Sequence, residues 1–119
     1  MTEYDLKTPI YLQVIDKMKA RILSGLWPPG SRVLSVRELA VQFEVNPNTM
    51  QRSLSEMERE GLMYTERTSG RFITEDREIL EASRRITAVS IITVFANRMR
   101  ELGFSIDEII KLIEEEYNA

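Results

Sequence analysis

Two short helices joined by a tight turn are predicted between residues 35 and 61, and this pair constrains the fold more than any other part of the chain. Ser35 precedes an apolar-periodic run and Glu38 follows three residues later, which is the spacing of a capping box at a helix start. A second start signal follows at once, because Asn46 can cap a helix and Pro47 suits its first position. These two start signals predict a helix-turn-helix unit, and the rest of the chain has to pack around it.

The second of these helices has one apolar side and one polar side. Met50, Leu54 and Met57 recur at helical spacing and predict a buried stripe. The opposite side carries amide, hydroxyl and guanidinium groups, which pair with base edges in a DNA major groove. Its members are Asn48, Arg52, Ser55 and Arg59, with Gln51 at the flank. Any solvated helix is polar outside, so an ordinary surface helix is the alternative interpretation, although alternating Glu and Lys would be more typical of one.

Composition excludes several classes of site. The 119 residues include no Cys and no His, which excludes disulfides, the usual zinc sites, and Ser-His or Cys-His nucleophile pairs. We expect no metal, no cofactor and no enzymatic activity, since the sequence also shows no phosphate-cradling Gly loop. No apolar run is long enough to span a membrane and no secretory signal opens the chain, so we expect a cytoplasmic protein.

The net charge of −3 is unevenly distributed. Residues 1–74 hold 10 Lys and Arg against 9 Asp and Glu, a net of +1, whereas residues 75–119 hold 6 against 10, a net of −4. The acidity therefore lies in the C-terminal part, and a small basic patch can exist in the N-terminal part.

Two further elements complete an N-terminal domain over residues 1–74. An amphipathic helix is predicted from Pro9 to Gly25, and two short strands are predicted around a turn at residues 67–70. Three helices followed by a hairpin form a winged helix-turn-helix, in which the hairpin tip can lie along a minor groove or on phosphates. Arg67 and Arg71 flank that tip. The alternative is an ordinary exposed hairpin whose charges prevent unwanted strand pairing.

Residues 75–119 predict two helices that serve dimerisation. The centre of the first, residues 86–96, has eight apolar residues of eleven, so it must be covered on more than one side. A final helix begins with a capping box at Ser105 and Glu108 and can cover one side. We expect a second copy of the chain to cover another, although the winged domain of the same chain is an alternative. The predicted interface residues are Ile86, Val89, Ile92, Thr93 and Ala96.

Residues 9–73 resemble the GntR family of bacterial transcription regulators. The resemblance lies in three blocks that occur in the order and spacing of the family: PIYLQVIDKMKARILSG, PPGSRVLSVRELA and VNPNTMQRSLSEMEREG, followed by a hairpin that ends GRFI. The two-helix tail is similar to that of the YtrA-type subfamily. The chain departs from the family pattern at Leu34, where Pro is usual, and at Thr68, where a second Gly is usual in the hairpin tip.

The resemblance implies a dimeric DNA-binding regulator, with a repressor as the expected type, that binds a palindromic operator in double-stranded DNA. It implies a specific set of contact residues in the helix pair and the hairpin tip. They are Ser35, Arg37, Asn46, Asn48, Thr49, Gln51, Arg52, Arg67, Ser69, Gly70 and Arg71. A winged-helix adaptor for protein or RNA is the alternative function. A small-molecule effector is a further candidate partner, for which Phe95, Met99 and Phe104 could line a groove, although plain core residues are the simpler interpretation.

Overall fold

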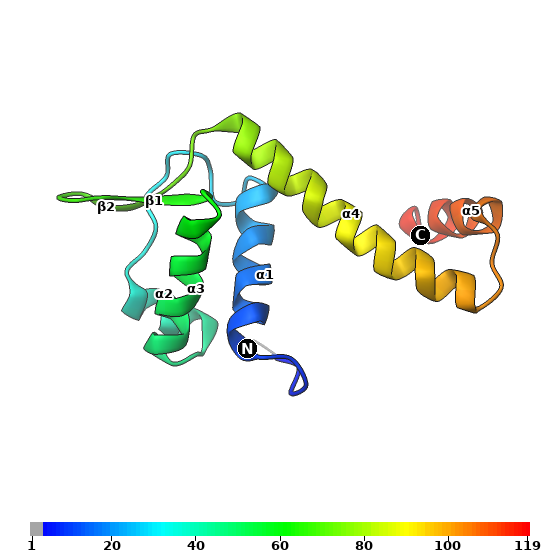
Figure 1. The fold of residues 1–119 in the computed structure, drawn as a ribbon, viewed down its shortest axis with the longest axis horizontal. Coiled ribbons are helices and arrows are strands. Elements are labelled where there is room, and N and C mark those ends of the chain that lie inside the picture. Colours follow the sequence, from blue (N-terminus) through cyan, green and yellow to red (C-terminus); the bar gives the residue numbers. More distant parts are fainter. Residues whose placement is uncertain (1–3) are drawn as a thin grey trace. The chain divides into compact units, whose positions relative to one another are not determined.

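Figure 1 shows the computed structural model, which describes residues 4–119. The elements are, in order, α1 (Ile10–Leu23), α2 (Val36–Phe43), α3 (Pro47–Arg59), β1 (Met63–Glu66), β2 (Gly70–Ile73), α4 (Arg77–Glu101) and α5 (Ile106–Tyr117). This order confirms the predicted fold class, a mainly helical chain with an N-terminal winged helix-turn-helix and two C-terminal helices. The chain forms two compact units, of which the first ends at Ser83 and the second begins at Arg84.

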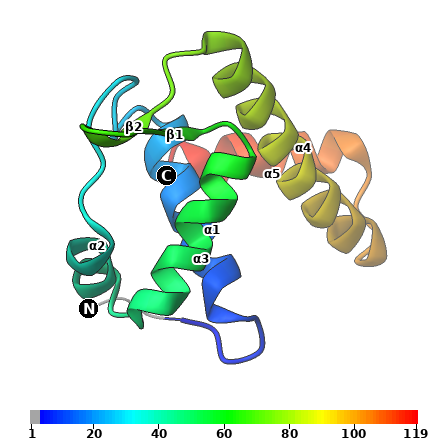
Figure 2. The same ribbon diagram turned by 60° about the vertical axis from the view of Figure 1, so that its left-hand side comes forward.

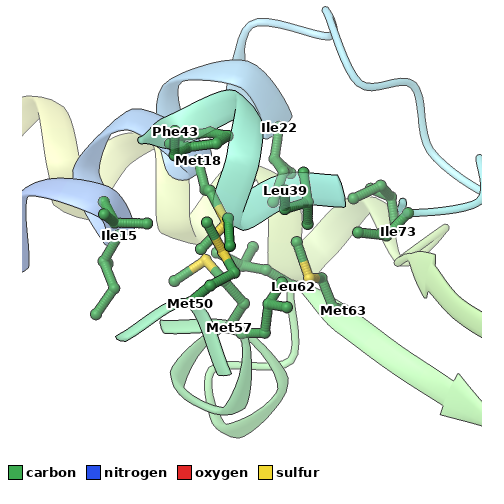
Figure 3. Close-up of a cluster of buried hydrophobic side chains, with 14 residues drawn as sticks. Ile15, Met18, Ile22, Leu39, Phe43, Met50, Met57, Leu62, Met63 and Ile73 are labelled. Carbon is green, nitrogen blue, oxygen red and sulfur yellow. The ribbon is translucent and has the colours of Figure 1, made fainter. Parts of the chain in front are cut away.

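The core of the first unit lies among α1, α2, α3 and the base of the hairpin (Figure 3). Met50, Leu54 and Met57 are all fully buried, which confirms the predicted stripe of α3. Ser53 is buried on the same helix, and its hydroxyl donates to the Thr49 carbonyl at 2.9 Å and contacts the Tyr11 carbonyl at 3.3 Å. A buried hydroxyl with partners costs little, so this small polar residue lets α1 approach α3 closely.

Local capping fixes the ends of α2 and α3, as the sequence predicts. The amide of Glu38 donates to the Ser35 hydroxyl at 3.2 Å, and the amide of Ser35 donates to the Glu38 carboxylate at 3.3 Å. Glu44 ends α2 in the left-handed conformation with φ 55°, and its backbone turns the chain sharply toward α3. Asn46 then caps α3 by accepting from the amide of Asn48 at 2.7 Å.

The hairpin pairs Met63 with Ile73 and Glu66 with Gly70 in antiparallel register. Residues 30–33, which lead into α2, also hydrogen-bond to β2 around an isolated β-bridge between Arg32 and Phe72. The amides of Gly30 and Val33 donate to carbonyls of β2, and the amide of Ile73 donates back to Ser31, all at 2.9 Å. The hairpin is therefore tied directly to the chain that enters α2 (Figure 2).

The first unit extends past the predicted domain boundary at residue 74. Asp76 caps α4 by accepting from the amides of Glu78 at 3.0 Å and Ile79 at 3.3 Å. Ile79 and Leu80 then pack against the N-terminal core, which explains why the compact unit ends only at Ser83. The division of function between residues 1–74 and 75–119 stays a prediction.

Within the second unit, the two helices cover little of each other's apolar surface. The predicted capping box of α5 is present, with hydrogen bonds of 3.0 and 3.2 Å between Ser105 and Glu108. Of the apolar stripe of α5 only Ile109 is buried, whereas Ile106 and Tyr117 are exposed at 67% and 87%. Most of the stripe that was expected to pack on one side of α4 is therefore exposed in the single chain, and only Ile109 is buried. Among residues 4–119, no helix has both the length and the apolarity needed to cross a bilayer.

Candidate nucleic-acid interface

The N-terminal half of α3 presents a row of polar side chains. Asn48, Gln51 and Arg52 are exposed, whereas Thr49 is half-buried. Gln51 donates from Nε2 to the Ser55 hydroxyl at 3.3 Å, a weak contact that an incoming acceptor can replace. This end of the helix therefore exposes amide and guanidinium groups, which are side chains of the kind that can pair with base edges.

Arg52 is held in place by an aromatic ring of another helix. Its guanidinium carbon lies 3.6 Å from the centroid of the Tyr11 ring in α1, which is a close cation–π contact. A guanidinium that stacks by its face keeps its N–H groups directed outward at the edges, where they can form a bidentate pair. No spacing signal in the sequence links Tyr11 to Arg52.

The C-terminal half of α3 is unsuited to an anionic partner. Arg59 forms an ion pair and hydrogen bonds with Glu56, and the hydrogen bond from Arg59 is the main cause that lowers the pKa of the Glu56 carboxyl. Glu60 pairs with Lys19 of α1 at 2.7 Å. Because Arg59 and Lys19 are each paired with a carboxylate, this half of the helix attracts an anion less than the N-terminal half does.

Arg37 of α2 lies beside the start of α3. Both Arg37 and Asn46 line an open hollow of about 550 Å³ between the C-terminal half of α2 and the α2–α3 turn. The Arg37 side chain is exposed, whereas the Asn46 side-chain oxygen is occupied by the helix cap. The structure thus brings the predicted contact residue of α2 next to those of α3.

The wing carries one exposed cation in its turn and one paired cation at the start of β2. Arg67 is exposed in the turn between β1 and β2. Arg71 instead donates from Nε to Glu58 of α3 at 3.2 Å, and the Thr65 hydroxyl donates to the same carboxylate. Burial raises the pKa of Glu58, but the hydrogen bonds from Thr65 and Arg71 outweigh it and leave that pKa below its ordinary value. Arg71 therefore anchors the wing to α3, a role that the sequence does not predict.

Some of the predicted residues of the wing and the α2 start line a second hollow, whereas Ser69 is half-buried in the turn and is not among its lining residues. This hollow has a volume of about 660 Å³ and lies between the wing and the residues that enter α2. Its lining includes Ser35, Gly70 and Arg71, which the sequence predicts as contacts, and Arg32, which it does not. Arg32 follows the PPG turn and precedes the capping box, and its basic charge in an extended link was the only available signal.

The winged unit coincides with a known domain. Residues 10–73 match the family described as bacterial regulatory proteins, gntR family. The chain belongs to the GntR family. The match covers α1 through β2, which are the elements that build both hollows and the exposed end of α3.

Relatives extend the likeness to the C-terminal helices. The HTH-type transcriptional regulator YhcF of Bacillus subtilis is 38% identical over 94% of this chain and 93% of its own length. The HTH-type transcriptional repressor YtrA of the same bacterium is 40% identical, but over 69% of this chain and 63% of its own length. These similarities agree with the predicted YtrA-type subfamily. Both relatives are named as transcriptional regulators, which argues against an enzymatic function.

Solved structures show the same fold. A GntR family transcriptional regulator from Listeria monocytogenes matches with a TM-score of 0.88 and 35% identity, over 94% of this chain and 98% of its own. AraR(DBD), solved in complex with operator ORR3, matches with a TM-score of 0.53 and 27% identity, over 62% of this chain and 87% of its own. A protein with a similar winged fold has therefore been observed on operator DNA.

Proposed function

We propose that this protein is a transcription repressor that binds a palindromic operator as a homodimer. The observation that carries the proposal is the exposed N-terminal half of α3, where Asn48, Gln51 and Arg52 stand beside Arg37 of α2. Amide and guanidinium side chains at the start of a recognition helix can read base edges in a major groove. The AraR structure with its operator and the repressor name of YtrA support the same function for this chain.

The proposed contacts fall into three groups. Asn48, Gln51 and Arg52 read bases, while the backbone and side chains around Asn46 and Thr49 position the helix on phosphates. Arg37 of α2 and Ser35 at the start of that helix contact the same DNA strand as the start of α3. Arg67, Ser69 and Gly70 place the wing tip at the neighbouring minor groove, with Arg71 in a supporting role through its ion pair with Glu58. As a protein that acts on bacterial DNA, it would function in the cytoplasm.

Selection of binding sites from random double-stranded DNA tests the function directly. A dimeric regulator should enrich two inverted half-sites, with centres about one helical turn, or 10–10.5 base pairs, or a multiple of that apart. A winged-helix adaptor for protein or RNA would enrich no short palindromic sequence. That outcome would refute operator binding.

We infer further that α4 forms the dimer contact. Ile86, Val89, Thr93 and Ala96 follow spacings of three, four and three residues and so lie along one side of the helix. Their apolar members are open to a partner, since Ile86 is 70% and Val89 49% exposed. Thr93 suits a buried seam as well, because its hydroxyl already donates to the Val89 carbonyl at 2.8 Å and would leave no donor unpaired.

The variant Ile92→Asp tests this contact. Ile92 is 60% exposed in the single chain, so the substitution should leave the fold intact but place a charge in the dimer seam. Sedimentation equilibrium should show a dimer for the wild type and a monomer for the variant, with loss of operator binding. Leu26→Asp, at a residue 70% exposed in the first unit, is the matched control and should stay dimeric. If Ile92→Asp also stays dimeric, α4 is not the interface.

A small-molecule effector stays a prediction. Phe95 is 38% exposed, whereas Met99 and Phe104 are half-buried beside the turn between α4 and α5. The Phe104 amide donates to the Met99 carbonyl at 3.1 Å across Gly103, whose φ is +88°. This is the hydrogen bond of an ordinary helix C-terminus, which fits the simpler interpretation of these residues as packing residues.

A further inference from the structure

We propose that Arg32 neutralises a phosphate of the DNA strand that passes between α3 and the wing. The proposal rests on the operator binding proposed above and assigns one additional contact residue to it. Arg32 precedes α2 and forms an isolated antiparallel β-bridge with Phe72 of β2. The backbone hydrogen bonds of Gly30 and Val33 to β2 fix the chain on both sides of Arg32, so the hairpin sets the position of its Cα.

The hollow of about 660 Å³ gives Arg32 its setting. The hollow is bounded on one side by the wing, through Thr65 and Gly70, and on the other by the start of α2, through Ser35. The Arg32 guanidinium lies along the wing, with Nε and Nη2 both 3.4 Å from the position that a Cβ on Gly70 would occupy. The guanidinium is thus held at the edge of an open, partly polar depression and stays exposed to solvent.

Charge distinguishes Arg32 from the other groups around this hollow. Arg71 is neutralised by Glu58, and the carboxylate of Glu38 is engaged by the amide of Ser35 at 3.3 Å. Among residues 4–119, no carboxylate forms an ion pair with Arg32. Arg32 therefore contributes a positive charge that no ion pair within the described part of the chain neutralises, whereas the Glu38 carboxylate at the same hollow keeps its negative charge.

The position that a winged helix takes on a DNA duplex indicates which anion would lie near Arg32. If α3 enters a major groove and the wing tip reaches the adjacent minor groove, one sugar–phosphate strand must separate the two elements. The hollow lies between the wing and the residues that lead into α2, the helix that supports α3. A phosphate of the intervening strand is therefore the partner that fits Arg32.

Salt-dependent binding to the selected duplex tests the assignment. Each neutralised phosphate adds about 0.9 to the slope of log affinity against log salt, so Arg32→Ala in a dimer should reduce the slope by about 1.8. When salt rises from about 50 to 200 mM, both proteins should lose affinity. The factor lost by the variant should be about one twelfth of the factor lost by the wild type. Base preference should be unchanged, and Arg32→Lys should keep the slope of the wild type. Arg77→Ala, which removes an exposed charge at the start of α4, is the matched control.

Replacement of single phosphates in the DNA backbone locates the contact of Arg32. Each phosphate of the duplex is replaced in turn by a neutral methylphosphonate, and affinity is measured by fluorescence anisotropy. In the wild type, replacement of one phosphate per half-site, between the contacted major-groove and minor-groove segments, should weaken binding. In Arg32→Ala the same replacement should have no further effect. Equal melting temperatures of the variant and the wild type, measured by circular dichroism, establish that the fold is intact.

The possible results separate this assignment from the function on which it rests. If the wild type binds a preferred duplex but Arg32→Ala keeps the full salt slope, the phosphate contact is refuted and operator binding stands. An altered preference for A·T pairs in Arg32→Ala also overturns the assignment, because it would place the guanidinium in the minor groove instead of on a phosphate. If the wild type prefers no duplex sequence, both the operator function and the role of Arg32 fall.

Discussion

Because Arg52 stacks on Tyr11, a substitution at either residue should weaken operator binding, and the two effects should not add. A bidentate Arg–guanine pair contributes about 1–3 kcal/mol of discrimination, so Arg52→Ala should weaken operator binding about 5- to 160-fold per half-site and relax preference at one base position. The ring of Tyr11 lies 3.6 Å from the guanidinium. An exposed cation–π contact is worth about 0.5–1 kcal/mol, so Tyr11→Leu should cost about two- to fivefold through disorder of Arg52.

A double-mutant cycle separates this mechanism from a general loss of packing. Affinity for the selected duplex is measured by anisotropy for the wild type, Tyr11→Leu, Arg52→Ala and the double variant. The cost of Tyr11→Leu should vanish once Arg52 is absent, because the ring then has no guanidinium to hold. Tyr11→Phe is the matched control, since it keeps the aromatic face and should bind like the wild type.

Two results would refute this reasoning. Additive losses in the double variant would show that Tyr11 acts on binding independently of Arg52. Unchanged affinity and base preference in Arg52→Ala would show that the guanidinium does not face the DNA, and the polar side assigned to α3 would be wrong. Tyr11 also packs against the core, so its substitution can weaken binding by destabilising the fold. Urea unfolding of each variant separates that effect from the loss of the contact with Arg52.

Two further predictions concern stability. Glu58→Gln should lower the free energy of unfolding by about 1 kcal/mol at pH 7, since it weakens charge-assisted hydrogen bonds to Arg71 and Thr65. Because the folded pKa of Glu58 is lowered, this stabilisation is present above the ordinary carboxyl pKa and is lost as the pH falls through the folded value. Urea titrations of the two proteins should therefore begin to converge below the ordinary carboxyl pKa and coincide only below the lower folded pKa. Leu54→Ala, at a fully buried position, should cost about 2–5 kcal/mol in the same assay, whereas Val41→Ala, 77% exposed on α2, should change it by less than about 0.5 kcal/mol. A small loss for Leu54→Ala would mean that the stripe of α3 is not the centre of the core.

Much of the site could be predicted because its positions are set by local rules. Ser35 and Asn46 form the caps that the sequence predicts, and these caps fix where α2 and α3 begin. Helical spacing then determines that Asn48, Gln51 and Arg52 are exposed while Met50 and Leu54 are buried. Such properties depend on neighbours within a few residues, so one chain suffices to derive them.

The partners of individual charges could not be predicted, because they lie far away in sequence. Arg71 is separated from Glu58 by 13 positions, and no periodicity connects a strand residue with a helix residue across a turn. The placement of Tyr11 under Arg52 likewise requires α1 to pack on α3 at a particular angle. The exposure of the α5 stripe was also missed, since a helical pattern shows which side is apolar but not which surface covers it.

The sequence by itself determined the helix-turn-helix, the hairpin, the C-terminal helix pair and the polar side of α3, because capping and hydrophobic periodicity are local and strong. The tertiary structure alone decided which cations are available to a phosphate. It places Arg71 and Arg59 in ion pairs and stacks Arg52 on a ring, whereas no ion pair among residues 4–119 involves Arg32. The physical reason is that the electrostatic interaction of a charge depends on its distance to other charges in space, which only the packed chain defines.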